Sequence, residues 1–381
     1  MRSIQIKSHT IELPTYLPDA TLAVVRNLLS SQVAATGITG AVVNTYHLRT
    51  QPGLETLKAF GGVHQFMQWP GFIASDSGGF QLFSLIAKNP QLGKVVDDGV
   101  VLYTDTKRQH KTLFTPEDSI IAQFAINSDI MICLDDFTPP DADEKRIAQS
   151  VERTIEWAKR SKAEFLRQLE LHGYTGWNDA GRPKLFAPIQ GHTHKTWRAH
   201  CAQELLAIGF DGFGLGGWPF TDTGFDYDFC AFNASLTPDE FPRFALGVGT
   251  PENIIRLRQM GYDFFDCVLP TRDARHHRLY VLKITKLTTL WPQLLSNPES
   301  VNRSSWLEYA YLNRTAFAQQ QKPLDPDCPC ELCQHYSPAY LHHLFKAQDA
   351  LAFQLATLHN LTTYARVIAW IKAQEQTPIT Q

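Results

Sequence analysis

Residues 72–81 read Phe-Ile-Ala-Ser-Asp-Ser-Gly-Gly-Phe-Gln, a short apolar run that meets a carboxylate, a glycine pair and then the start of a helical pattern. This is how a buried strand passes through a tight turn into a helix, as in parallel β/α folds. Seven further apolar or β-branched runs recur along the first three quarters of the chain, at 15–17, 41–44, 130–134, 185–189, 212–215, 243–246 and 263–268. Eight such units predict an α/β fold, a (β/α)8 TIM barrel.

The chain has 381 residues, enough for such a barrel and an appendage. The strand–helix rhythm fades after Lys286, so we expect a catalytic barrel over 1–286 and a helical, metal-binding subdomain over 287–381 packed on it. Within the barrel, the segment 88–111 reads as a hairpin-like insertion before a helix that Pro116 opens.

Composition limits the class of protein. A hydrophobic content of 44% with 19% charged residues is ordinary for a globular enzyme. No apolar run approaches the length of a membrane span, and the N-terminus lacks the apolar stretch of a secretory signal. We therefore expect a cytoplasmic protein without a membrane segment.

Three of the seven cysteines stand together as Cys328-Pro-Cys330-Glu-Leu-Cys333. An odd number of cysteines in a long chain argues against a disulfide framework and this spacing favours metal, with three buried free thiols as the alternative. Three thiolates and one imidazole complete a closed tetrahedral Zn²⁺ shell, which is structural rather than catalytic. Spacing leaves the fourth ligand open among four downstream histidines, His335, His342, His343 and His359.

Polar or glycine residues end most of the predicted strands. In a barrel the carboxyl ends of the strands converge on one mouth, so these residues would share an active-site rim. The alternative is that they are turn formers and helix caps. They are Asn44, Asp76, Asp135, Gln190, Gly217 and Gly247, with Asp266 inside the last strand.

Several of these positions carry distinct chemistry. Asp76 is a candidate acid or base, and the glycine turn after it lets the backbone approach a planar ligand on which Phe80 stacks. Asp135 and Gln190 offer acceptors and donors that suit a guanine-like edge, whereas the neighbouring Asp136 reads equally well as a cap. Asp266 lies in the most apolar strand, where a carboxylate is costly without a partner or a purpose.

A local basic stretch follows the last strand. The net charge is −3, so any nucleic-acid site must be a patch rather than a basic surface overall. Such a patch suits phosphates beside the mouth, and a solvated charged face is the alternative. Its residues are Arg272, Arg275, Arg278, Lys283 and Lys286, against the single acid Asp273.

Over nearly its whole length the chain resembles the tRNA-guanine transglycosylases, the queuine or preQ1 tRNA-ribosyltransferases of bacterial type. The matching motifs are Asn44-Thr45-Tyr46-His47-Leu48, Ser75-Asp76-Ser77-Gly78-Gly79, Gln190-Gly191, Gly216-Gly217, Gly247-Val248-Gly249-Thr250-Pro251, the stretch 266–275, and the cysteine cluster with His359-Asn360.

The resemblance implies exchange of guanine at wobble position 34 of GUN-anticodon tRNAs for a 7-deazaguanine base by double displacement, in queuosine biosynthesis or salvage. It makes Asp266 the nucleophile at ribose C1′, Asp76 the general acid and base, and His359 the fourth zinc ligand. It also implies a homodimer. Base-binding residues would be Ser77, Gly78, Gly79, Phe80, Asp135, Gln190 and Gly217. RNA-binding residues would be Gly247, Val248, Gly249, Thr250, Pro251, Glu252, Asn253, Thr271, Arg272, Asp273, Ala274 and Arg275.

The chain also departs from the family pattern. Bacterial members usually follow the double glycine with Leu-Ala-Val-Gly-Glu, whereas residues 218–222 read Trp-Pro-Phe-Thr-Asp. Phe137, Phe80 and His277 stand where cysteine, tyrosine and glycine are usual. These changes leave open whether the incoming base is preQ1, queuine or another 7-deazaguanine, and we hypothesise an altered base preference.

Two other functions fit the same barrel. One is a DNA-acting 7-deazaguanine transglycosylase, and the intact cysteine cluster and the arginine segment favour tRNA over it. The other is a non-catalytic RNA-binding accessory subunit, and the presence of both Asp266 and Asp76 argues against that class.

Overall fold

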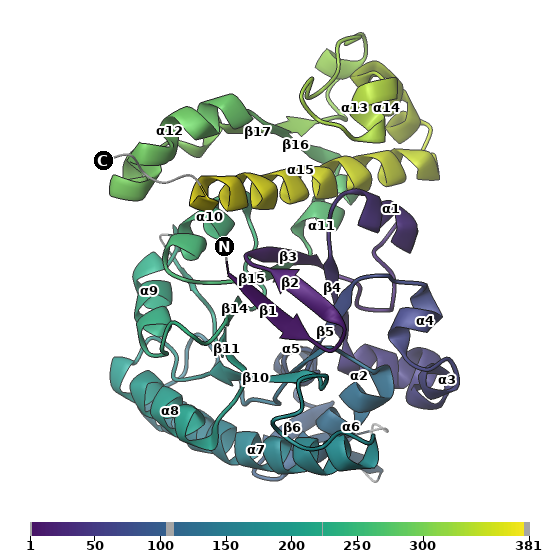
Figure 1. Ribbon diagram of the computed structural model, residues 1–381. Coiled ribbons are helices and arrows are strands. Elements are labelled where there is room, and N and C mark those ends of the chain that lie inside the picture. The colour runs from purple at the N-terminus through teal and green to yellow at the C-terminus, as the bar shows by residue number, and fades with distance from the viewer. Residues whose placement is uncertain (1, 104–109, 223, 377–381) are drawn as a thin grey trace.

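A parallel barrel forms the body of the computed structural model, which describes residues 2–103, 110–222 and 224–376 (Figure 1). Eight parallel strands pair in the order β3-β15-β14-β11-β10-β9-β5-β4. Each predicted strand is present to within one or two residues at its ends, so the predicted barrel is confirmed. The strands are β3 (Thr15–Pro18), β4 (Gly40–Asn44), β5 (Phe72–Asp76), β9 (Ile130–Ile132), β10 (Lys184–Ile189), β11 (Gly212–Leu215), β14 (Arg243–Ala245) and β15 (Phe264–Cys267).

The barrel closes between its first and last paired strands. A parallel bridge joins Asp19 to Val42, and the Ala20 amide donates to the Val42 carbonyl at 2.7 Å. The interior is filled by apolar side chains, as in other eight-stranded barrels. A hairpin of β1 (Ser3–Ile6) and β2 (His9–Glu12) covers the N-terminal end and adds Ile6 and Ile11 to that core.

Helices surround the strands. The 28-residue α7 (Glu144–Leu171) shows the pattern that places them, because Ile147, Val151, Ile155 and Ala158 recur at helical spacing and are buried against the sheet. The other outer helices include α1 (Ser30–Ala35), α2 (Thr45–Leu48), α3 (Leu54–Ala59), α4 (Val63–Met67), α5 (Gly79–Lys88), α6 (Pro116–Ile126), α8 (Lys195–Ile208), α9 (Tyr227–Ser235) and α10 (Pro251–Gln259). Within the described ranges, none of the helices is both long and apolar enough to span a membrane.

The insertion after α5 is an antiparallel sheet of β6 (Gly93–Val96), β7 (Gly99–Tyr103) and β8 (Lys111–Phe114). The predicted hairpin is therefore confirmed and gains a third strand; residues 104–109 lie outside the described part. Helix α6 then begins at Pro116, as predicted, with the Thr115 hydroxyl accepting from the Asp118 amide at 3.1 Å.

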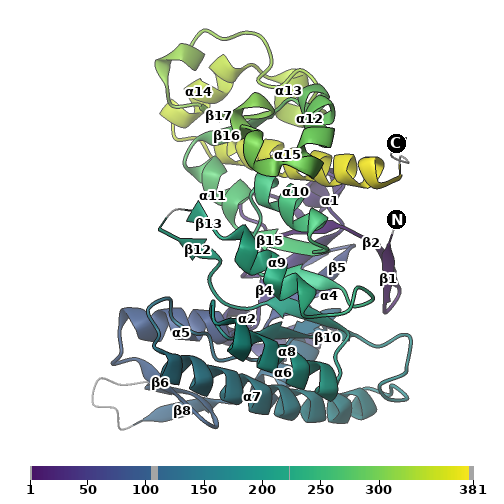
Figure 2. The same ribbon diagram turned by 90° about the vertical axis from the view of Figure 1, so that its left-hand side faces the viewer.

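The C-terminal region is built on one long helix, α15 (Ala350–Gln376), which lies across the barrel in contact with β3, α1 and α10 (Figures 1 and 2). It thus occupies part of the outer layer of the barrel. The region also contains β17 (Leu307–Tyr311), paired with β16 (Arg278–Leu282), so it is less purely helical than expected. Helices α12 (Ile284–Ser296), α13 (Glu331–His335) and α14 (Pro338–Lys346) complete it, whereas α11 (Leu269–Arg275) directly follows the last barrel strand.

Candidate active site and metal centre

The residues predicted to form the rim lie at one end of the barrel. Asp76 and Asp266 stand at the carboxyl ends of β5 and β15, while Asp135, Gln190 and Gly217 follow β9, β10 and β11. Figure 2 shows the start of α11 on the same side as the hairpin of β12 (Phe220–Thr221) and β13 (Gly224–Phe225), whereas the β1–β2 hairpin lies on the opposite side. The barrel therefore brings these side chains to one mouth.

Asp76 is held by donors from two segments. One carboxylate oxygen accepts from the Asn44 side-chain amide at 2.8 Å, and the other accepts from the backbone amides of Thr45 at 3.1 Å and Gly78 at 3.0 Å. Burial nevertheless outweighs these donors and raises the pKa of Asp76 to about 7, with a smaller contribution from the charge of Asp266. A carboxyl group with this pKa can give or take a proton near neutral pH.

Asp266 has fewer partners. Within the described part of the chain, its carboxylate accepts one hydrogen bond, from the Gly247 amide at 2.8 Å. Burial raises its pKa to about 7, with a smaller contribution from the charge of Asp19. The other carboxylate oxygen of Asp266 has no hydrogen-bond donor within the described ranges, which suits a nucleophile.

A group of polar residues lies on the same rim as these two carboxylates, just after β9, β10 and β11. The Gln190 amide nitrogen donates to Asp135 at 2.6 Å, while its buried amide oxygen has no hydrogen-bond partner among the residues that the structure describes. Burial raises the pKa of Asp135 to about 6. Gly217 has φ +102°, and a Cβ there would approach the Arg198 guanidinium to 3.3 Å, so only glycine leaves this wall open. The unpartnered amide oxygen marks a site for a ligand with an N–H donor.

The glycine turn after Asp76 lies against the same group of polar residues, since a Cβ at Gly79 would come within 3.4 Å of the Asp135 carbonyl oxygen. Gly78 has φ +82°, and a Cβ there would lie 3.0 Å from the Tyr46 side chain. Ser77 is buried, and its hydroxyl accepts from the Gly79 amide at 3.2 Å. Phe80 is 46% exposed, with its ring 5.2 Å from that of Phe137, so one face is available at the mouth.

The two segments expected to hold RNA are only partly exposed. In the first, Gly247 is exposed, whereas Val248 and Asn253 are buried and the Thr250 hydroxyl caps α10. In the second, Arg272 is exposed and Arg275 is half-buried. Of the wider basic stretch, Arg278 is paired with Asp273 at 2.6 Å, so the free positive charge on α11 comes from the two arginines.

The cysteine cluster forms a compact, buried set of donors. The Cys328, Cys330 and Cys333 sulfurs lie 3.7, 3.3 and 3.4 Å from Nδ1 of His359. Tetrahedral coordination by zinc places sulfur and nitrogen ligands about 3.5 Å apart, so the spacing fits a metal ion. The four residues could hold one ion in a closed shell.

Two observations decide which histidine belongs to this set. Nε2 of His359 lies 2.6 Å from the Tyr280 carbonyl, which leaves Nδ1 free to face the sulfurs. His342 is bonded to the Leu312 carbonyl, while His335 and His343 are exposed. The cysteine spacing allows four histidines as the fourth member of this cluster, and the fold places Nδ1 of His359 beside the three sulfurs.

Comparison with known proteins assigns the chain to a protein family. The family model described as queuine tRNA-ribosyltransferase matches residues 1–375. The chain belongs to this family. Queuine tRNA-ribosyltransferases of Pseudoalteromonas translucida and Thiobacillus denitrificans are 36% and 34% identical to it, each over 95% of this chain and over 86% and 88% of their own lengths. That of Caldanaerobacter subterraneus is 36% identical over 92% of this chain and 83% of its own.

In this family member, one residue that supports the pocket had no signal in the sequence. Arg198, on α8, is 1% exposed and has no carboxylate among its hydrogen-bond partners. Its guanidinium donates to the carbonyls of Ile189 at 2.8 Å and Gly216 at 2.9 Å, each one residue before Gln190 and Gly217. Arg198 therefore holds the two chain segments that carry Gln190 and Gly217, yet in the sequence it is one arginine in a helix.

Asp136 is also better explained by the structure than by helix capping. Its buried carboxylate binds Arg146 at 2.6 and 2.8 Å and Arg153 at 2.6 Å, both on α7. The Thr154 hydroxyl accepts from the Asp136 amide at 3.1 Å. These bonds fix the segment that presents the adjacent Asp135 to the pocket.

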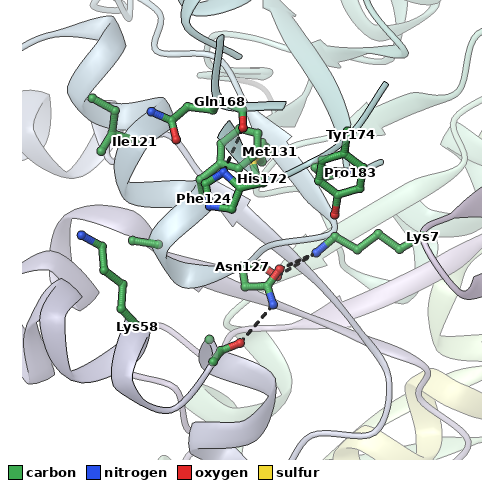
Figure 3. A pocket seen from close by; sticks show the side chains of 13 residues that line it. Lys7, Lys58, Ile121, Phe124, Asn127, Met131, Gln168, His172, Tyr174 and Pro183 are labelled. Carbon is green, nitrogen blue, oxygen red and sulfur yellow. Dashed lines mark hydrogen bonds between the residues drawn. The ribbon is translucent and has the colours of Figure 1, made fainter. Parts of the chain in front are cut away.

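The other end of the barrel carries a pocket and a second histidine–carboxylate group. The pocket, of about 480 Å³, is lined by residues that include Lys7, Asn127 and Tyr174 (Figure 3). Nearby, His9, His64 and Asp129 come close enough to bind a cation. Asp129, however, already accepts from His64 at 2.8 Å and pairs with Lys7 at 3.2 Å. We interpret this group as a brace for the β1–β2 hairpin.

Proposed function

We propose that this protein is a pentosyltransferase, a tRNA-guanine transglycosylase that exchanges guanine 34 of GUN-anticodon tRNAs for a 7-deazaguanine base, preQ1 or queuine. One observation carries the proposal. Two carboxyl groups, each with a pKa of about 7, face one mouth beside Gln190, whose buried amide oxygen has no hydrogen-bond partner among the described residues. The names of the relatives at about a third identity support the same reaction.

The reaction needs a nucleophile and a proton carrier. In the first step a carboxylate oxygen of Asp266 bonds to ribose C1′ as the bond from C1′ to N9 of guanine breaks, and Asp76 gives its proton to the departing base. In the second step N9 of the incoming base attacks C1′, the ester bond to Asp266 breaks, and the N9 proton passes to Asp76. Two displacements retain the configuration at C1′.

The same geometry suits recognition of guanine and its 7-deaza analogues. Asp135 would accept from the N1–H of the base, and the unpartnered amide oxygen of Gln190 would accept from its 2-amino group. Phe80 would stack on the ring. The base must be splayed out of the RNA loop to reach this pocket. Backbone amides at Gly78, Gly79 and Gly217 would line it, together with Ser77.

Other parts of the proposal concern partners and organisation. Residues 247–253 and 271–275 would hold the anticodon loop, with Arg272 and Arg275 on phosphates. The metal would be one structural Zn²⁺, since three thiolates and an imidazole leave it no open position. We also propose a homodimer, a cytoplasmic location that keeps the thiols reduced, and the division at residue 286 into barrel and zinc-binding subdomain.

Exchange of radiolabelled guanine into unmodified tRNA tests the proposal. We expect label in tRNAs with a GUN anticodon and not in tRNAs with other anticodons, followed by its release when preQ1 or queuine is added. Incorporation into duplex DNA instead of tRNA would favour the DNA-acting alternative. No exchange into either nucleic acid, by metal-loaded protein, would contradict the proposal and favour an accessory role.

The raised pKa values predict the pH dependence of exchange. Asp266 must be ionised to attack, so activity is lost as pH falls below its pKa of about 7. Asp76 must carry a proton when guanine leaves, so activity is also lost as pH rises above its pKa of about 7. We expect a bell-shaped profile of kcat/KM with a maximum near neutrality and a fall of about tenfold per pH unit on each side. A flat profile between about pH 5 and 9 would be incompatible with these roles.

A further inference from the structure

Two large aromatic side chains stand exposed on the rim beside Gly217. Trp218 is 46% exposed and Phe220 is 44% exposed, with their ring centroids 5.2 Å apart. Adjacent exposed aromatic rings are costly in water and are enriched at sites that bind other molecules. This pair therefore needs a partner.

The β12–β13 hairpin holds these rings in place. Phe220 pairs in register with Phe225, whose ring contacts it edge-on at 5.2 Å. The Asp226 amide donates to the Pro219 carbonyl at 2.9 Å and closes the base of the hairpin. The aromatic surface is thus preformed, so that little side-chain entropy remains to be lost on binding.

The row of rings continues to the segment proposed to hold RNA. Phe225 contacts Tyr227 at 4.8 Å. The Tyr227 hydroxyl donates to the side chain of Asn253 at 2.8 Å, and the Arg256 guanidinium lies 3.2 Å from the Tyr227 ring centroid. The rings therefore join the base pocket at Gly217 to the N-terminal turn of α10.

The exposed side chains point outward rather than into the base pocket. Within 218–222 only Pro219 is buried, and Thr221 and Asp222 are exposed like the two aromatic residues. Gln190, by contrast, is buried and Gly217 is half-buried. The unusual sequence at 218–222 thus changes the outer rim more than the surface that meets the exchanged base.

We propose that Trp218 and Phe220 form a stacking platform for an unpaired RNA base next to the exchanged nucleotide. This rests on the proposed function, which places an RNA loop at this mouth. A loop whose central base is splayed into the pocket exposes the faces of its neighbours, and aromatic side chains bind such faces without regard to sequence. Two side chains are too small an apolar area to hold a second protein chain by themselves.

The test uses guanine exchange into an anticodon stem-loop with the full-length, metal-loaded protein. The variants are Trp218→Ala, Phe220→Ala and the double variant. Loss of base stacking should raise the KM and the Kd for RNA about tenfold in the double variant. The KM for guanine and kcat should stay within about twofold of wild type. Trp218→Phe should retain most of the affinity because it keeps a ring.

Phe60→Ala is the matched control, since Phe60 is 54% exposed at the end of α3, beside the opposite mouth. It should change neither constant. A second RNA, abasic at the nucleotides flanking the exchanged one, should bind wild type and the double variant equally, because no neighbouring base remains to stack.

The outcomes separate this inference from the proposed function. If wild type exchanges guanine but the variants keep the wild-type KM for RNA, the platform is wrong and the proposed function stands. A rise in the KM for guanine alone would assign the aromatic pair to base selection, and an equal loss on abasic RNA would assign it to the fold; both overturn the inference. If the wild-type protein exchanges no guanine, both the stacking platform and the proposed function are contradicted.

Discussion

Asp266→Asn is expected to lower the kcat of guanine exchange by about 10⁴-fold or more, the scale seen when an enzyme loses its nucleophile. The amide is nearly isosteric and its oxygen can still accept from the Gly247 amide, so the fold should be kept. It cannot, however, form the ester with ribose C1′. Exchange of labelled guanine under saturating RNA measures the loss.

The same variant should be at least as stable as wild type. The pKa of Asp266 is raised in the folded protein to about 7. A carboxyl group whose pKa is higher in the folded than in the unfolded protein destabilises the fold as the pH rises from the unfolded pKa to the folded pKa. The charge of Asp266 therefore opposes folding at pH 8. Removing it should leave the melting temperature at pH 8 unchanged or higher.

Asp228→Asn serves as the matched control, because Asp228 is exposed on α9 and lies outside the proposed site. It should leave both kcat and the melting temperature unchanged. An Asp266→Asn variant that melts like wild type and keeps more than about a tenth of the activity would contradict the nucleophilic role.

Loss of the metal site is expected to have the second large effect, on stability. His359→Ala should abolish binding of the single metal ion and lower the melting temperature by at least about 10 °C. The reason is that the cluster ties the segment 328–333 to α15, and α15 is part of the outer layer of the barrel. Metal analysis of the purified protein and a thermal melt measure both quantities.

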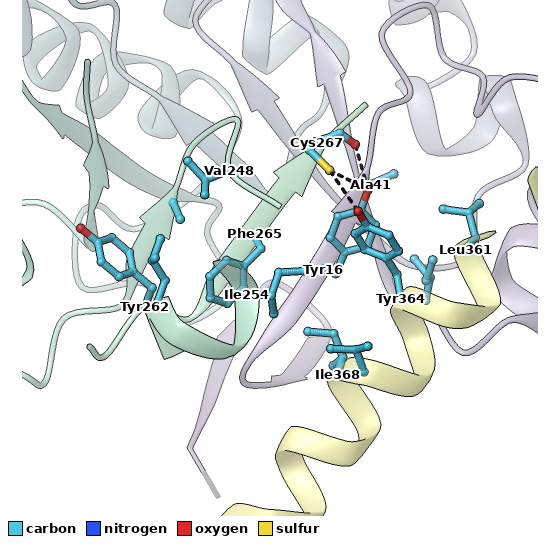
Figure 4. Close-up of a cluster of buried hydrophobic side chains, with 14 of the residues drawn as sticks. Tyr16, Ala41, Val248, Ile254, Tyr262, Phe265, Cys267, Leu361, Tyr364 and Ile368 are labelled. Atoms are coloured by element: carbon cyan, nitrogen blue, oxygen red, sulfur yellow. Dashed lines mark hydrogen bonds between the residues drawn. The ribbon is translucent and has the colours of Figure 1, made fainter. Parts of the chain in front are cut away.

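Loss of the metal should also affect the active site through α15. The Asn360 side chain, next to His359, donates to the Pro270 carbonyl at the start of α11 at 3.0 Å. One turn further along α15, the ring centroid of Tyr364 lies 4.5 Å from that of Tyr16. The Tyr16 hydroxyl in turn donates to the Cys267 carbonyl at 2.8 Å (Figure 4). Cys267 follows Asp266, so a displaced α15 removes support from the strand that carries the nucleophile.

His343→Ala is the control for the metal prediction, because His343 was one of the four histidines that spacing allowed and it is exposed on α14. This variant should keep one metal per chain and the wild-type melting temperature. Full metal content in His359→Ala would show that another residue completes the shell.

The sequence predicted the parts of this molecule that depend on local pattern. The eight strands are short apolar runs with turn residues after them, and the barrel places their carboxyl ends at one mouth, so Asp76, Asp135 and Gln190 could be grouped before the fold was known. The cysteine spacing likewise predicted three of the four residues in the buried cluster that could hold a metal ion.

The remaining features depend on contacts between segments that no local pattern records. Arg198 donates to backbone carbonyls at the ends of two different strands. Asp136 is paired with Arg146 and Arg153, which lie on α7. The position of α15 in the outer layer of the barrel follows from packing over a large sequence separation. Such positions look like ordinary helix residues until the chain is folded.

The most direct test of the account is to capture the bond between enzyme and RNA. Wild-type protein is incubated with an anticodon stem-loop, denatured, and resolved on a denaturing gel, and the attachment site is mapped by mass spectrometry. The account predicts a covalent protein–RNA adduct at Asp266 that disappears when excess guanine is added before denaturation, and no adduct with Asp266→Asn. An adduct mapped to another residue, or one that persists in Asp266→Asn, would contradict it.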